Sequence, residues 1–328
     1  MWQRLLASGR AGCSVCGGVL LFAATAAADE GATSVWLPGQ YSSFAAVPSS
    51  PGFSIPLVYY HADASASATH HFVIGGQLVA GIDEQSSLLF LTPTWAFPHA
   101  FWAADAELAV GWAVGRVAVR VSGVIDCTGT QCPPSLSRTK SGSQWGGSDL
   151  DPTFSLKWVH GDNNQMAYLL ANVPTGAYEV DRLANIGLNH WAIDGGYGYT
   201  YLDEKSGHEL SVVAGVTYNF DNPATHHRSG LDSHLDFALS QFLNARWHLG
   251  LVGYAYYQLT DDSGSGVPAV LGGFRAQVFA LGPEAGYFFA MKGAEGYVSL
   301  RGYWEFGAKN RPEGWNAYLT CSLPIGGK

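Results

Sequence analysis

The sequence predicts an all-β protein, a transmembrane antiparallel outer-membrane β-barrel of about 14 strands, with 12 as the alternative count. Three observations carry this prediction. The chain starts with an export signal, only 13% of its residues are charged while 47% are hydrophobic, and apolar and polar residues alternate over long segments. Soluble domains typically carry about 25% charged residues. Alternation, rather than continuous hydrophobicity, is typical of a barrel wall with lipid on one side only.

Residues 1–28 form a predicted secretory signal peptide. Arg4 and Arg10 precede an apolar run from Val19 to Ala28, which is about half of the roughly 20 residues that a membrane-spanning helix requires. We therefore expect cleavage near Ala28 rather than an uncleaved anchor. No later segment offers about 18 consecutive apolar residues, so we do not expect the mature chain to cross a membrane as helices. This pattern predicts the outer membrane of a Gram-negative cell.

The charge balance is acidic. The whole chain has 17 Lys and Arg against 26 Asp and Glu, a net charge of −9, and loss of Arg4 and Arg10 with the signal would make it −11. Such a chain offers no basic surface for nucleic acid, so we expect no nucleic-acid partner.

Residues 29–52 form an irregular N-terminal segment that shows no alternation and is interrupted by three prolines. Val35, Trp36 and Phe44 would be poorly placed in water. The segment either plugs the lumen or trails in the periplasm, and we favour partial occupation of the lumen.

Residues 53–328 are predicted to form the barrel. In the segment from Arg246 to Thr260 every second residue from Trp247 to Leu259 is apolar or glycine. From Trp247 to Tyr257, at ~3.4 Å per residue and a tilt of ~40°, it would rise roughly 26 Å, which matches the apolar band between two aromatic girdles. Further strands are expected near the following residues: Phe53, Phe72, Ser86, Phe101, Arg116, Leu150, Gln165, His190, His208, Asp232, Phe274, Gly296 and Gly314. The segment from Phe101 to Ile125 is split at Gly115 to keep the count even.

Connections between these strands alternate in length. Short polar turns are expected at 161–164 and 203–207, and long loops at 126–148, 176–189, 221–230 and 261–272. Outer-membrane barrels have short periplasmic turns and long extracellular loops, so the long loops are expected outside the cell.

Cys127 and Cys132 lie in a polar loop rich in Gly and Pro. Because an exported protein reaches an oxidising compartment, we predict a disulfide between them, with two free thiols as the alternative. Zinc is less favoured because no His lies nearby. The expected result is that intact mass does not change on alkylation without reductant. Alkylation of both thiols in the native protein would contradict the prediction.

Strand alternation sorts residues into lipid and lumen faces. The charged residues of the best-defined strands fall on the polar face, as lipid requires, because an Arg or Lys at the midplane costs ~2–4 kcal/mol. Lumen-lining candidates are Asp151, Lys157, Asp194, Glu209, His234, Asp236, Tyr254, Arg301 and Glu305. The favoured interpretation is structural, with charges paired across a solvated lumen. The alternative is a constriction that selects solutes.

The sequence does not favour an enzyme. Ser233, His234 and Asp236 are close in sequence, but alternation places Ser233 and His234 on opposite faces, so they cannot share a proton. Neither a Gly-x-Ser-x-Gly elbow between strand and helix nor a His-Glu-x-x-His motif is present. We expect no metal and no cofactor.

Several stretches carry a resemblance to a known family: "RSGLDSHLDFALSQFL", "GLVGYAYYQLTDDSG", "GGFRAQVFALGPEAGY" and "SLRGYWEFGAKNRPEGWNAYLTCSLPI". Together with "NHWAIDGGYGYTYLDEKSGHELSVVAGVTYNFDNPAT" they resemble the SphA-like outer-membrane proteins of the meta-pathway of phenol degradation. The resemblance implies a porin-like transporter often encoded beside aromatic-catabolism genes. One departure concerns the barrel assembly machinery, an expected partner that reads a terminal aromatic residue in many barrels, because here Ile325 would have to close the last strand.

The expected function is an outer-membrane channel for passive uptake of small hydrophobic or aromatic compounds. Its other expected partners are outer-membrane lipid and the solute. The alternatives are a structural or adhesive barrel without transport and, less favoured, a lipid-modifying enzyme.

Overall fold

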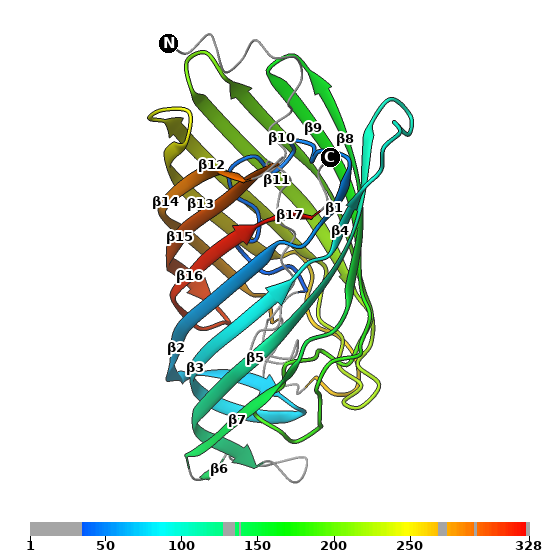
Figure 1. Ribbon diagram of the computed structural model, residues 1–328. Coiled ribbons are helices and arrows are strands. Elements are labelled where there is room, and N and C mark those ends of the chain that lie inside the picture. Colours follow the sequence, from blue (N-terminus) through cyan, green and yellow to red (C-terminus); the bar gives the residue numbers. More distant parts are fainter. Residues whose placement is uncertain (1–34, 127–134, 138, 268–273, 292–293, 326–328) are drawn as a thin grey trace.

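All strands belong to one antiparallel sheet that closes on itself (Figure 1). The computed structural model describes residues 35–126, 135–137, 139–267, 274–291 and 294–325. The first and last long strands close the barrel, with Tyr60 opposite Tyr318. The wall strands are β2 (Leu57–Ile74), β3 (Gln77–Leu91), β5 (Asp105–Asp126), β8 (Asp151–His160), β9 (Asn163–Asn172), β10 (Ala192–Asp203), β11 (His208–Asn219), β12 (Asp232–Phe242), β13 (Trp247–Gln258), β14 (Gln277–Met291), β15 (Ala294–Lys309) and β16 (Glu313–Ser322).

The prediction of 14 strands is wrong, and the alternative of 12 is correct for the described residues. The sheet contains 17 strands, but five are short continuations of a neighbour, so twelve form the wall. The continuations are β1 (Gly52–Ser54), β4 (Thr94–Ala96), β6 (Ser135–Ser137), β7 (Lys140–Gly147) and β17 (Pro324–Ile325). In particular, β6, β7 and β8 follow one another along the same edge of β5.

Two wrong strand boundaries explain the difference between 14 and 12 strands. Gly115 lies inside β5 and is not a turn. A Cβ at this position would meet the Ser87 carbonyl oxygen at 2.1 Å. Gly115 marks a close approach of two strands. Phe72 is not a separate strand either, since β2 continues to Ile74 and turns into β3 through Gly75 and Gly76, both with positive φ.

The predicted alternation between lipid and lumen faces is present. Leu239, Leu251 and Leu300 are 46–58% exposed on the outer surface, while their neighbours Ser240 and Arg301 are buried. The strand predicted from Trp247 is β13. Aromatic pairs lie toward both ends of the wall, Trp247 with Tyr287 and Tyr218 with Phe220. The lipid-facing wall therefore has the apolar surface and aromatic edges that a membrane barrel requires.

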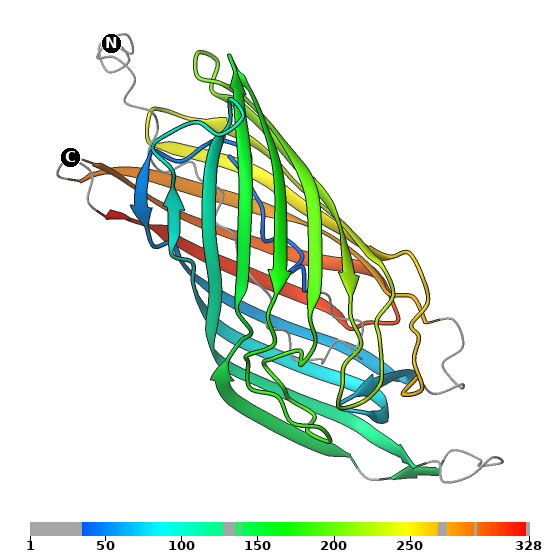
Figure 2. The same cartoon turned by 90° about the vertical axis from the view of Figure 1, so that its right-hand side faces the viewer.

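The two rims differ. Turns 161–162, 204–207 and 243–246 lie at the rim where β2 begins and β16 ends, and segments 173–191, 220–231 and 259–267 lie at the other (Figures 1 and 2). By the rule for outer-membrane barrels, the short-turn rim is periplasmic and the long-loop rim extracellular. Across the described ranges, no helix is long and apolar enough to span a membrane. The predicted signal peptide and both cysteines of the predicted disulfide lie outside the described residues.

On the extracellular side, β2, β3, β5 and β7 continue beyond the rest of the wall as a strand extension (Figure 2). Loop 173–191 packs on its inner face, where Leu183 and Ile186 join a buried cluster with Ile74, Val79 and Val121. The sequence predicted a loop over 126–148, but β6 and β7 occupy part of that range.

Candidate functional site: the barrel lumen

The inward faces of the strands form a lumen filled with side chains. Among the predicted lining residues, Asp151, Lys157, Asp194, Glu209, His234, Asp236, Tyr254 and Arg301 are all buried, and Glu305 is partly buried. These side chains do not simply face water. Most of them contact residues 35–51, which we call the lumen segment.

The lumen segment lies inside the barrel and leads to β1 at the periplasmic rim (Figure 1). Val35, Trp36, Leu37, Tyr41 and Phe44 are at most 2% exposed. The segment forms turns rather than a strand, as expected from its prolines. At Gly39, φ is +83°, a conformation that favours glycine, and a Cβ would meet the Tyr254 and Tyr303 rings at 3.0 Å, so those rings would have to shift to admit one.

Carboxylates of the wall bind backbone N–H groups of the lumen segment. Asp236 accepts hydrogen bonds from the backbone N–H groups of Gly39 (3.0 Å) and Tyr41 (3.2 Å). Glu209 accepts one from the backbone N–H of Phe44 at 3.0 Å. Buried N–H groups need such acceptors, and charged acceptors form the stronger bonds. Asp236 and Glu209 therefore fix the path of an otherwise irregular chain.

Wall donors bind the carbonyl groups of the same turn. Arg301 donates from Nε to the Gly39 carbonyl (3.3 Å) and from Nη2 to the Gln40 carbonyl (3.2 Å). The Tyr318 hydroxyl donates to the Pro38 carbonyl at 2.7 Å. Arg301 and Asp236 thus hold opposite polar groups of one turn, and the structure brings together two residues that the sequence could only assign separately to the lumen.

A second set of polar contacts anchors the end of the lumen segment. Lys157 forms a buried ion pair with Glu107 (3.0 Å) and donates to the Val47 carbonyl at 3.2 Å. Glu107 also accepts from the Ser49 backbone N–H at 2.8 Å. Glu107 was absent from the predicted lumen-lining residues. Strand alternation could have identified it, because Glu107 lies on the inward face of β5.

Aromatic rings surround the segment along its length. The Trp36 ring stacks on the His234 ring with centroids 3.5 Å apart and an interplanar angle of 12°. Tyr41 and Tyr168 extend this stack, with centroids 5.2 Å and 5.7 Å from that of Trp36. His234 Nε2 lies 3.1 Å from Asp194 Oδ2. This cluster packs flat aromatic faces against one another in the interior of the barrel.

A second aromatic cluster lies around Phe44. His248, Phe288 and Tyr297 meet the Phe44 ring edge-on, with centroids 5.1–6.2 Å apart. Sequence alternation gave no reason to single out His248 or Tyr297, because their role depends on the position of Phe44. Most partners of the lumen segment in the wall are more than 100 residues away in sequence.

Ser233 and His234 lie on opposite faces of β12. Ser233 donates outward to the Tyr257 carbonyl while His234 points inward, so the two do not form a dyad. Within the part of the chain that the structure describes, no group of three or more His, Cys, Asp or Glu side chains is placed to hold a metal ion.

The closed antiparallel wall, its lipid-facing exterior and its polar and aromatic interior define an outer-membrane β-barrel. The family model "Putative MetA-pathway of phenol degradation" matches residues 68–320. The chain belongs to this family, which confirms the resemblance found in the sequence.

Solved structures agree with this fold. The COG4313 outer membrane channel from Pseudomonas putida F1 has a TM-score of 0.66 at 17% identity, covering 84% of this chain and 96% of that chain. A Pseudomonas aeruginosa FadL homologue has a TM-score of 0.44 at 11% identity, covering 96% and 98%. Of these two, the first supports a shared fold. A search of curated proteins found no match.

Proposed function

We propose that this protein is a channel for passive uptake of small hydrophobic or aromatic compounds across the outer membrane. The observation that carries the proposal is the aromatic interior of the barrel. Trp36, Tyr41 and Phe44 of the lumen segment pack on rings of the wall, among them Tyr168 and His234. Rings of this kind bind flat solutes weakly, which suits conduction better than a single tight site. Membership of a phenol-degradation family supports the same class of solute.

The charges of the lumen favour the same solutes. Lys157 is paired with Glu107, and the carboxylate of Asp236 is held by backbone N–H groups. Charges that are already paired offer little to an ion or sugar, because a new partner would have to displace existing bonds. We propose no nucleotide-driven step, so transport runs down a gradient.

In the proposed channel the lumen segment is a gate. Its side chains are buried against the wall, and its rings contact rings of the wall, as Trp36 contacts His234. A solute therefore passes when the segment shifts and exchanges its ring contacts for contacts with the solute. The wall holds the segment through side-chain contacts and hydrogen bonds, and the segment is not a strand of the sheet, so such a shift leaves the hydrogen-bonded ladder of the barrel intact.

Liposomes containing the full-length protein test this function. We expect phenol to enter at least about tenfold faster than a sugar of similar size, since a tenfold ratio requires a difference of only about 1.4 kcal/mol in barrier height, within the range of one or two aromatic contacts. Uptake is followed by a fluorescent or enzymatic reporter inside the vesicle, with protein-free liposomes as the control for phenol that crosses lipid unaided.

A folded barrel that passes neither solute would favour the structural alternative. Equal permeability to phenol and sugar would indicate a general pore and would contradict the proposed aromatic selectivity. Folding is checked independently by the heat-modifiable gel mobility of outer-membrane barrels.

A further inference from the structure

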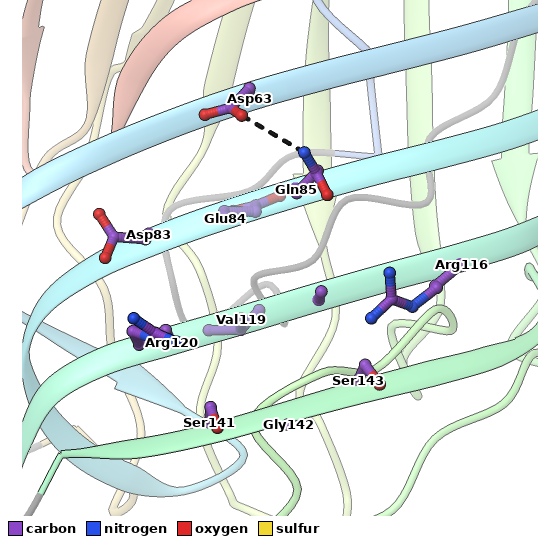
Figure 3. Close-up of a pocket in the computed structure, with 11 residues that line it drawn as sticks. Asp63, Asp83, Glu84, Gln85, Arg116, Val119, Arg120, Ser141, Gly142 and Ser143 are labelled. Carbon is purple, nitrogen blue, oxygen red and sulfur yellow. Dashed lines mark hydrogen bonds between the residues drawn. The ribbon is translucent and has the colours of Figure 1, made fainter.

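The outer face of the strand extension carries a polar groove that the lumen does not explain. The groove has a volume of about 530 Å³. Figure 3 shows its lining, in which β2 and β3 supply acids and an amide while β5 and β7 supply arginines and serines. Arg116, Arg120, Asp83, Ser141 and Ser143 are all exposed on this outer surface.

The groove begins where the lipid-facing surface ends. On β5 the outward residues from Ala106 to Val114 are apolar, and at ~3.4 Å per residue and a tilt of ~40° they rise about 21 Å, close to the ~25 Å apolar band of a membrane barrel. The next outward residue toward the extracellular side is Arg116.

On β2 and β3 the outer surface changes from apolar to polar at the same level, while Trp145 of β7 is paired with Arg116. Tyr59, Leu89 and Val114 are paired across β2, β3 and β5 and form the last apolar row. In the following row, Ser87 of β3 is paired with Arg116 of β5. This coincidence on adjacent strands places the groove at the level of the lipid headgroups, directly above the acyl chains.

The two arginines are available to a ligand. Arg116 and Arg120 share one face of β5, four residues apart, which corresponds to a spacing of about 13 Å. Asp83 is paired with Arg120 in the ladder, yet within the described residues neither guanidinium takes part in a hydrogen bond or ion pair. Arginine forks bind phosphate oxygens in a bidentate manner, so the pair suits two phosphates held a short distance apart.

The other half of the groove has a different chemistry. Asp63 accepts a hydrogen bond from Gln85 at 3.4 Å (Figure 3). Carboxylate and amide groups bind the hydroxyl and amide groups of a sugar, whereas Arg116 and Arg120 bind its phosphates. Ser141 and Ser143 add hydroxyl groups on the arginine side. The combination fits a phosphorylated amino-sugar headgroup better than a simple phosphate.

We propose that this groove binds the bisphosphorylated disaccharide headgroup of lipid A in the outer leaflet, with its acyl chains lying over the apolar row formed by Tyr59, Leu89 and Val114. The bound lipid would cover the polar outer face of the strand extension at the membrane border. This inference concerns the outer wall and does not depend on what passes through the lumen.

Native mass spectrometry of the full-length protein in detergent tests the proposal. The probes are bisphosphorylated lipid A, monophosphorylated lipid A, phosphatidylethanolamine and soluble glucosamine 6-phosphate. We expect bisphosphorylated lipid A to bind at least tenfold more weakly to the Arg116→Ala/Arg120→Ala variant, and the monophosphorylated form to bind the unsubstituted protein several-fold more weakly than the bisphosphorylated form. The matched control is Arg246→Ala/Arg275→Ala, which removes the same charge elsewhere and should retain binding.

Equal lipid A affinity of the Arg116→Ala/Arg120→Ala variant and the unsubstituted protein would overturn the proposal. So would binding of glucosamine 6-phosphate as tightly as lipid A, since it would assign the groove to a soluble phosphate. All three proteins should show the same heat-modifiable mobility, because the substituted side chains are exposed.

Discussion

A disulfide between residues 43 and 240 is expected to close the channel. In the Ser43→Cys/Ser240→Cys variant, oxidation should lower phenol flux at least about tenfold. Flux is proportional to the fraction of molecules whose gate is open, and the bridge should reduce that fraction at least about tenfold. The two serine hydroxyls are in direct hydrogen-bond contact and both residues are buried. A bridge at this point would hold the lumen segment against β12 with little movement of either backbone.

Reduction should restore the flux of the same sample, which separates locking from misfolding. The single variants Ser43→Cys and Ser240→Cys are the matched controls, because each carries one substitution without a bridge. Ser43 also donates to Glu284 at 2.7 Å, so the Ser43→Cys control measures the effect of losing that bond. Undiminished flux in the fully oxidised double variant would show that solutes pass while the segment is in place.

The fold was largely accessible to sequence reasoning because lipid imposes a simple rule. Where a strand crosses the membrane, as in β12 and β13, each outward position must be apolar, and alternation then identifies the inward positions. The strand count failed where two strands are longer than a membrane crossing, because β5 was divided at Gly115 to keep the count even and β2 was divided near Phe72. On β5 and β2 the strands continue past the membrane, so Arg116 and His61 appear on the outward face and interrupt the pattern.

The site was accessible only in part. Alternation placed Asp236, Glu209 and Arg301 on the lumen side, but their partners are backbone groups of residues 39–44, separated from them by more than 160 residues. Nothing local in the sequence encodes such pairings. Composition did indicate that Trp36 and Phe44 avoid water. It did not indicate that Trp36 stacks on His234 or that Phe44 packs on His248.

Removal of the Asp236 carboxylate should have the opposite effect to the disulfide. Asp236→Ala leaves the buried N–H groups of Gly39 and Tyr41 without their acceptor, at a cost of about 1–3 kcal/mol for each group. The arginine on the other side of the turn also loses a nearby opposite charge. Both effects raise the free energy of the closed state, whereas a displaced segment can bond to water.

We therefore expect the Asp236→Ala variant to show at least about tenfold higher single-channel or bulk ionic conductance, since even the lower end of that cost, about 2 kcal/mol in total, shifts a two-state equilibrium more than tenfold. Planar-bilayer recording checks this directly. Asp232→Ala is the matched control, because Asp232 is a buried carboxylate on the same strand that accepts from Tyr256 and Asn219 of the wall. Equal conductance of Asp236→Ala and Asp232→Ala would mean that Asp236 supports the barrel and does not hold a gate. If the bonds to the lumen segment set the closed state, the conductance of Asp236→Asn, which keeps one acceptor oxygen, should lie between that of Asp236→Ala and that of the unsubstituted protein.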